Sequence, residues 1–109
     1  MTTSAEALHL RAEQAADLRR FDLARELAMQ SIAADATDGD GYASLGRACL
    51  GSGDLIGAES AFRQALAVDA NNAWYLRGLS VCLRNLNRPK DGLLSIEQAL
   101  QREPFYCGN

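Results

Sequence analysis

The sequence predicts an all-α protein, a solenoid made of three stacked helical hairpins. Ala and Leu, with 19 and 16 copies among 109 residues, dominate the composition, and Pro occurs only twice. Ala and Leu are strong helix formers. Residue size also recurs at an interval of 34 along the chain. A period of this length is typical of helix pairs that bury their apolar faces by stacking on the next pair.

Residues of similar size stand at equivalent positions of successive 34-residue units, and each such set is called a column here. The small columns are Ala12, Gly46 and Ser80; Ala24, Ala58 and Gly92; and Ser31, Ala65 and Ala99. The large columns are Leu8, Tyr42 and Leu76, and Ile32, Leu66 and Leu100. Small columns mark places where helix backbones approach closely, so a bulky residue at Gly46 or Ala65 is expected to overpack the stack. The chain is therefore expected to form one domain, 1–109, with units at 5–38, 39–72 and 73–106 and a short tail at 107–109.

Each unit is expected to hold a helix A, a short turn and a helix B. In the middle unit helix A is predicted at about 40–52 and helix B at about 55–68, with Asp54 as the N-cap of helix B. In the third unit Pro89 falls in the first turn of helix B, where its missing N–H costs nothing. Pro104 ends that helix.

The middle unit carries the residue pattern of a known repeat family. The pattern falls on Tyr42, Leu45, Gly46, Ala58, Phe62, Ala65 and Ala70, and only its final Pro is replaced. The unit resembles a tetratricopeptide repeat. The third unit is similar, whereas the first has Arg11 and Ala28 where Leu and an aromatic are usual. The resemblance implies a right-handed α-solenoid of three repeats and does not specify a function, because such repeats serve unrelated assemblies.

Composition argues against several classes of protein. The formal net charge of -3 is unsuited to a nucleic-acid backbone. No apolar run approaches the 18 residues of a membrane span, and the N-terminus has no secretory signal pattern. Three cysteines cannot all pair within one chain, which favours a reducing, cytoplasmic location. Cys49 and Cys82 are predicted to be buried, and Cys107 to be accessible in the tail.

The sequence predicts no catalytic site, metal site or cofactor. His9 is the single histidine, and no Cys or Asp stands near it at metal-ligand spacing. The glycine-rich stretch at 51–57 lacks the spacing of a phosphate loop and reads as a turn. The acidic cluster at 35–40 cannot be an EF-hand loop, since Tyr42 and Cys49 would stand at ligand positions. Helix capping is the expected role of its Asp residues. We therefore expect a protein that is not an enzyme.

The resemblance implies a concave groove, lined by the A helices, that binds a peptide segment of a partner protein. The groove positions of the second and third units are Ala43, Ser44, Arg47, Leu50, Trp74, Arg77, Gly78, Val81 and Arg84, with Asn85 beside them. The first unit contributes Glu6, His9, Leu10, Glu13 and Asp17, and the second adds Asp40.

Several of these residue types suit a binding groove. Trp74 offers a flat apolar anchor, and the three arginines can hold carboxylates or backbone carbonyls. The small residues Ala43, Ser44 and Gly78 are expected to leave room for a bulky ligand side chain. An acidic first half and a basic second half would orient a ligand that has one basic and one acidic end. The alternative is that these are ordinary solvated helix faces, with Trp74 packed on 71–72 and the second helix B.

Family relatives that grip the C-terminal carboxylate of heat-shock chaperones use a clamp of Lys, Asn and Arg residues. The clamp positions hold His9, Glu13, Ser44, Trp74 and Gly78 here, so that role is not expected. The third unit is also similar to small chaperones of type III secretion, which favours an adaptor or chaperone role.

The C-terminal end suggests a second function. The last predicted helix and the tail carry apolar residues that the short chain leaves incompletely covered: Leu93, Leu94, Leu100, Phe105 and Tyr106. An exposed apolar patch usually marks an interface. We therefore expect self-association or a tightly bound partner at this end. The competing hypothesis is a structural assembly or scaffolding factor of an envelope or pilus complex that acts through self-association.

Overall fold

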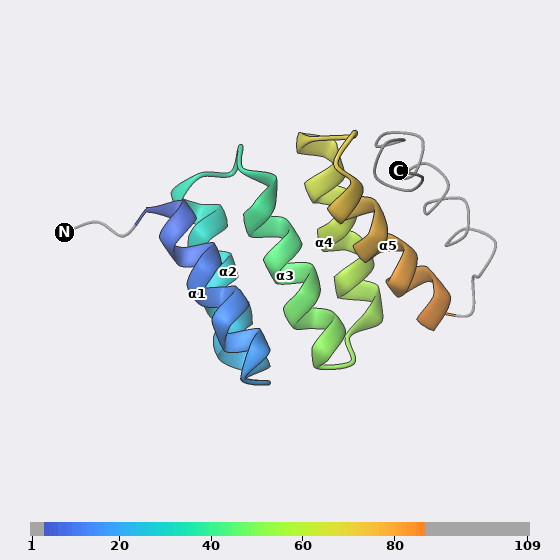
Figure 1. Ribbon diagram of the computed structural model, residues 1–109, viewed down its shortest axis with the longest axis horizontal. Coiled ribbons are helices and arrows are strands. Elements are labelled where there is room, and N and C mark those ends of the chain that lie inside the picture. Colours follow the sequence, from blue (N-terminus) through green and yellow to red (C-terminus); the bar gives the residue numbers. More distant parts are fainter. Residues whose placement is uncertain (1–3, 87–109) are drawn as a thin grey trace, which may run out of the picture.

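The computed structural model describes residues 4–86, which form five α-helices and no strand (Figure 1). The helices are α1 (Ala5–Asp17), α2 (Phe21–Ala34), α3 (Gly39–Gly51), α4 (Leu55–Val68) and α5 (Ala73–Asn85). The starts of α1, α3 and α5 are 34 residues apart, as are those of α2 and α4. The all-α helical solenoid is confirmed, and the middle-unit helices agree with prediction to within one residue.

Polar side chains fix where most of these helices begin. Ser4 Oγ accepts a hydrogen bond from the Ala7 amide at 3.1 Å, and Asp54 Oδ1 accepts one from the Gly57 amide at 2.9 Å. Asp38 caps α3 in the same way, and Asn72 caps α5. A side chain that satisfies an otherwise unpaired amide at a helix start is worth about 1 kcal/mol. The capping role predicted for Asp54 is confirmed.

The turn inside each hairpin needs one residue in the left-handed region. That residue is Arg19, with φ of 60°, between α1 and α2, and Gly53, with φ of 87°, between α3 and α4. The two positions are 34 residues apart, so both hairpins use the same turn. Glycine adopts this conformation without steric cost, whereas a residue with a Cβ atom is strained there.

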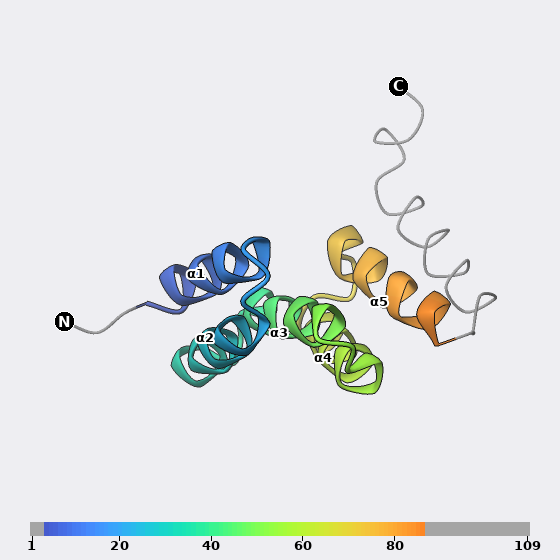
Figure 2. The same cartoon turned by 90° about the horizontal axis from the view of Figure 1, so that it is seen from below.

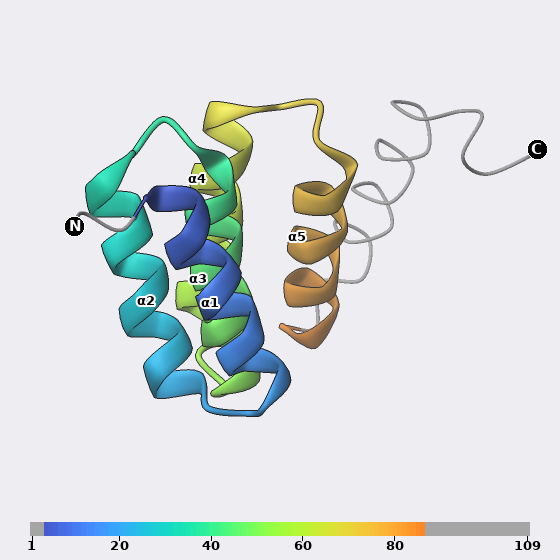
Figure 3. The ribbon, with the colours of Figure 1, turned by 60° about the vertical axis from the view of Figure 1, so that its left-hand side comes forward.

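The five helices lie in two layers. Successive helices pack on one another, and α3 also contacts α1 and α5. In Figure 2, α1 and α5 rise on either side of α3, whereas α2 and α4 lie on the opposite face. Figure 3 shows the same layers from the side. The A helices therefore line a concave face, and the B helices form the outer one.

Small buried residues allow the layers to pack closely. Ala24, Ala58 and Ala65 are fully buried. Ser31, in the same small column as Ala65, is also fully buried, and its hydroxyl donates a hydrogen bond of 2.8 Å to the Ala5 carbonyl. These contacts confirm that the small columns lie where backbones approach.

The two described cysteines belong to the core of the second and third units. Cys49 and Cys82 are buried free thiols that pack in one cluster with Phe62, Leu79 and Leu83. Burial raises the pKa of both thiols, that of Cys82 to about 11. Both cysteines act as small apolar residues, as predicted.

None of the helices within residues 4–86 is long and apolar enough to cross a membrane. The predicted self-association end lies outside the described residues: Leu93, Leu94, Leu100, Phe105 and Tyr106. The same holds for Cys107 and for helix B of the third unit.

Candidate functional site: a concave groove between α1, α3 and α5

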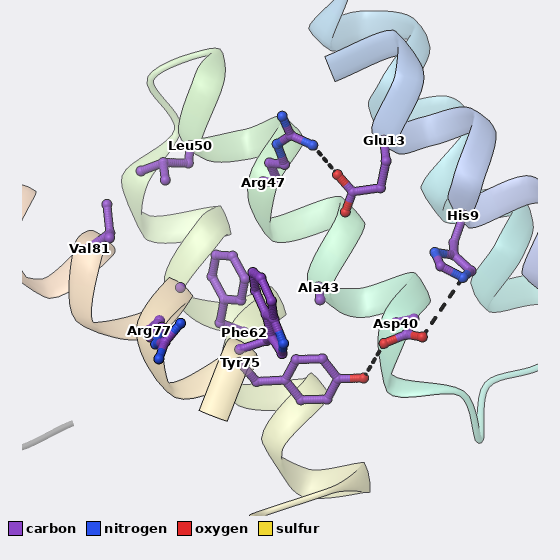
Figure 4. A pocket seen from close by; sticks show the side chains of 12 residues that line it. His9, Glu13, Asp40, Ala43, Arg47, Leu50, Phe62, Tyr75, Arg77 and Val81 are labelled. Atoms are coloured by element: carbon purple, nitrogen blue, oxygen red, sulfur yellow. Dashed lines mark hydrogen bonds and ion pairs between the residues drawn. The ribbon is translucent and has the colours of Figure 1, made fainter. Parts of the chain in front are cut away.

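The concave face carries a hollow of about 550 Å³. It is lined by His9 and Glu13 from α1, by Asp40, Ala43, Arg47 and Leu50 from α3, by Phe62 from α4, and by Trp74, Tyr75, Arg77, Gly78 and Val81 from α5 (Figure 4). Its volume falls in the range of ordinary ligand pockets. Eight of the eleven positions predicted in the second and third units border this hollow; Ser44, Arg84 and Asn85 do not.

One end of the groove is organised by Asp40. The Tyr75 hydroxyl donates a hydrogen bond of 2.6 Å to Asp40 Oδ1. His9 Nε2 lies 3.8 Å from Asp40 Oδ2 (Figure 4). Burial and the hydrogen bond to Asp40 raise the pKa of Tyr75 well above its usual range, so Tyr75 is neutral and acts as the donor. Asp40 thus links α3 to α5 and lies close to His9 of α1.

The sequence interpretation of His9 needs correction. The sequence has no Cys or Asp near His9 at metal-ligand spacing, but the stacking of repeats brings Asp40 of the next unit within 3.8 Å of it. Within residues 4–86, His9, Asp38 and Asp40 form the group whose donor atoms are close enough to hold a metal ion, all within 4.8 Å. Two of these residues have structural roles, since Asp38 caps α3 and Asp40 accepts a hydrogen bond from Tyr75.

The middle of the groove wall is a charged network between α1 and α3. Arg47 donates through Nη1 to Glu13 and through Nη2 to Asp17. Ser44 Oγ donates to Glu13 Oε1 at 3.2 Å. Hydrogen bonds to the two carboxylates raise the pKa of Arg47. Both are charge-assisted hydrogen bonds, and the partial exposure of the three side chains to solvent weakens them.

This network corrects two sequence interpretations. Arg47 was expected to hold a ligand carboxylate, but carboxylates from α1 already occupy both arms of its guanidinium. Ser44 was expected to leave open space, but it is buried beneath Glu13 and only 3% exposed. Both residues link the first unit to the second.

The groove also presents apolar side chains. Leu50 lies near the end of α3, and Val81, on α5, is 37% exposed. The Trp74 side chain is 71% exposed, and the Arg77 guanidinium lies 5.8 Å from the centre of its ring. The alternative that Trp74 is packed away against the second helix B is therefore wrong. An exposed indole on a groove rim is the kind of side chain that dominates binding interfaces.

Phe62 forms the apolar floor of the groove. It comes from α4, and its ring reaches between Gly46 of α3 and Gly78 of α5. A Cβ atom at Gly46 would lie 2.7 Å from the Phe62 ring, and one at Gly78 would overlap it. The room expected at Gly78 for a ligand is thus already filled by Phe62.

Sequence reasoning did not place Phe62 and Tyr75 in the groove. The sequence did contain a signal for Phe62, namely the two glycines that make room for its ring, Gly46 and Gly78, which are 32 residues apart. Arg84, predicted to line the groove, is exposed near the end of α5, outside the hollow. Within the first unit, Glu6, Leu10 and Asp17 likewise do not border it.

Comparison with known proteins identifies the repeat. The family model of the tetratricopeptide repeat matches residues 39–72, the whole of the middle unit. Residues 39–72 form a tetratricopeptide repeat. The fold of the chain is likewise that of tetratricopeptide domains in solved structures.

Three solved structures illustrate the similarity of fold. The first such domain of human RPAP3 superposes with a TM-score of 0.88 at 17% identity, covering 92% of this chain and 79% of that one. The second such domain of Spaghetti (RPAP3), bound to an HSP90 peptide, gives 0.85 at 20% identity, covering 93% and 94%. MamA from Desulfovibrio magneticus RS-1 gives 0.84 at 18% identity, covering 94% of this chain and 58% of that one. The chain thus spans less than two thirds of that MamA structure.

Proposed function

We propose that this chain is a non-catalytic protein–protein interaction module that binds a peptide segment of a partner in the groove between α1, α3 and α5. The observation that carries the proposal is the hollow of about 550 Å³, with Trp74 exposed on its rim. A concave, largely apolar surface with a few polar groups is the usual form of a binding site. Such a module serves as an adaptor or as a chaperone.

The solved structures support this use of the fold. Both domains of Spaghetti were determined with an HSP90 peptide bound. The clamp expected for such a peptide is replaced here by His9, Glu13, Ser44, Trp74 and Gly78, and the structure buries Ser44 beneath Glu13. The proposed partner segment is therefore of a different chemical class.

The proposal places the chain in the cytoplasm, where its buried cysteines stay reduced. A chaperone of bacterial secretion is the specific role that the similarity of the third unit favours. Its client is then expected to be encoded beside it and to copurify with it.

Site-specific photocrosslinking tests the site. A benzoylphenylalanine at Val81, inside the groove, is compared with one at Met29 on the outer helix α2, where the native side chain is 56% exposed. In the cells that make this protein, we expect crosslinks to a partner from position 81 and none from position 29. Crosslinks from position 29 alone would move the site to the outer face and refute the proposal.

A second candidate function is a self-associating scaffold. The surface formed by α1 and α2 exposes 72% of Leu18 and 36% of Leu23 and also includes Leu27. Sedimentation velocity across a hundredfold range of concentration tests this function. A Leu18→Ser variant that shifts an oligomer to the monomer supports it, and a wild-type monomer at every concentration rules it out.

A further inference from the structure

The charges around the groove are segregated by helix. The groove side of α1 and α3, including the α3 N-cap, carries four carboxylates and the guanidinium of Arg47. The carboxylates are those of Glu13, Asp17, Asp38 and Asp40. The charged residues of α5 are both arginines, Arg77 and Arg84. The wall formed by α1 and α3 therefore attracts a cation, and a negatively charged ligand group is disfavoured there.

Asp40 is the carboxylate of this wall best placed to receive a ligand cation. Glu13 and Asp17 both pair with Arg47, and Asp38 caps α3. Asp40 accepts one hydrogen bond from Tyr75 on Oδ1, whereas its Oδ2 lies 3.8 Å from His9 Nε2, beyond hydrogen-bond distance. A carboxylate accepts up to about four hydrogen bonds. The Asp40 side chain borders the hollow and is 49% exposed.

The surroundings of Asp40 suit a long basic side chain. Tyr75 fixes the carboxylate, so a ligand does not have to immobilise it. Ala43, Phe62 and Trp74 border the same hollow and offer apolar surface for the methylene stem of a lysine or an arginine. Leu50 and Val81 provide a separate apolar surface for a second side chain.

We infer that the peptide segment bound by this groove carries a lysine or arginine whose cation pairs with Asp40. A large apolar side chain of the same segment contacts Leu50 and Val81. This inference rests on the proposed function and adds the chemistry of the partner. The segment is basic where it meets α1 and α3, and so differs from an acidic C-terminal peptide.

A random peptide library tests this preference without a known partner. Phage-displayed peptides of about twelve residues are selected on the immobilised wild-type chain, on Asp40→Asn and on Asp22→Asn. Asp22 is the matched control, because it is the second residue of α2 as Asp40 is of α3, and it lies on the outer face. We expect wild type and Asp22→Asn to enrich a basic residue at a fixed spacing from a large apolar one. Asp40→Asn is expected to lose the basic position.

Binding of one selected peptide then measures the pair directly. In fluorescence anisotropy, replacing the peptide lysine by norleucine is expected to weaken binding to wild type about fivefold, since the pair is half-exposed. The same replacement is expected to change binding to Asp40→Asn less than twofold. A carbodiimide applied to the wild-type complex provides a readout that needs no variant. The carbodiimide adds to the Asp40 carboxylate and activates it. The lysine Nζ then attacks the activated carbonyl, the carbodiimide leaves as a urea, and an amide forms. Mass spectrometry locates this amide in the sequence.

The outcomes separate this inference from the proposed function. Three results would each overturn the pairing with Asp40. The selected peptides could lack a basic position, or the norleucine replacement could weaken binding to Asp40→Asn as much as to wild type. The amide could also be located at another carboxylate. Failure of the library to yield any peptide whose binding depends on Trp74 or Val81 would instead refute the groove as a peptide site.

Discussion

Replacing Gly46 by alanine is expected to destabilise the fold because the Phe62 ring is held between α3 and α5. A Cβ atom at position 46 would lie 2.7, 2.8 and 2.9 Å from three atoms of that ring. The ring is 6% exposed, and Gly78 confines it on the α5 side. The clash therefore involves a side chain held from both sides.

Two opposing effects determine the size of the change. Alanine inside a helix is favoured over glycine by about 1 kcal/mol. Overpacking a closely packed core costs about 1–3 kcal/mol. With the ring confined, the steric cost is expected to exceed the gain in helix propensity, giving a net loss of up to about 2 kcal/mol. For a domain of this size, each kcal/mol lost lowers the melting temperature by roughly 4–8 °C.

A double-mutant cycle with Phe62→Leu isolates the steric term. Leucine at 62 relieves the overlap, so Gly46→Ala is then expected to be neutral or to stabilise by up to about 1 kcal/mol. Urea unfolding followed by circular dichroism gives the four free energies. A stabilising Gly46→Ala in the wild-type chain, or the same loss in both backgrounds, would show that the ring does not confine this position.

Three further predictions concern the turns, the tyrosine and the thiols. Gly53→Ala is expected to cost about 1 kcal/mol in urea unfolding, because φ is 87° although no atom lies within 4 Å of the new Cβ. The pKa of Tyr75 is raised in the folded chain, so its contribution is complete below the ordinary tyrosine pKa of about 10 and is lost as pH rises above it. Between pH 8 and 10.5, Tyr75→Phe should therefore lose less stability than wild type. In Cys107→Ser, Cys82 is expected to react with a disulfide reagent at pH 8 at least about a hundredfold more slowly than in denaturant, because its pKa is about 11.

The sequence was sufficient to predict the helices of the middle unit, because the information is local. Small residues recur at fixed intervals, and Asp54 stands where a helix start needs an acceptor. The burial of Cys49 and Cys82 follows from the same register. These features depend on neighbours in the chain or on the period, and both can be read from one sequence.

The polar contacts of the groove were not predicted, because they join different repeats. Glu13 and Arg47 stand 34 residues apart, at equivalent positions of adjacent units, yet the period alone does not show that their side chains meet. Tyr75 reaches back to Asp40 over 35 residues. The period brings such positions close together, but side-chain length and rotamer decide which of them touch.

The junction at Asp40 has a mechanical consequence for the groove. The hydrogen bond from Tyr75 to Asp40 ties α5 to α3 at one end of the groove, whereas Leu50 and Val81 lie towards the opposite end. Separation of α3 from α5 is therefore resisted most at the end of the groove where this hydrogen bond lies. The width at the end near Leu50 and Val81 can then vary while the distance between α3 and α5 at Asp40 stays constant.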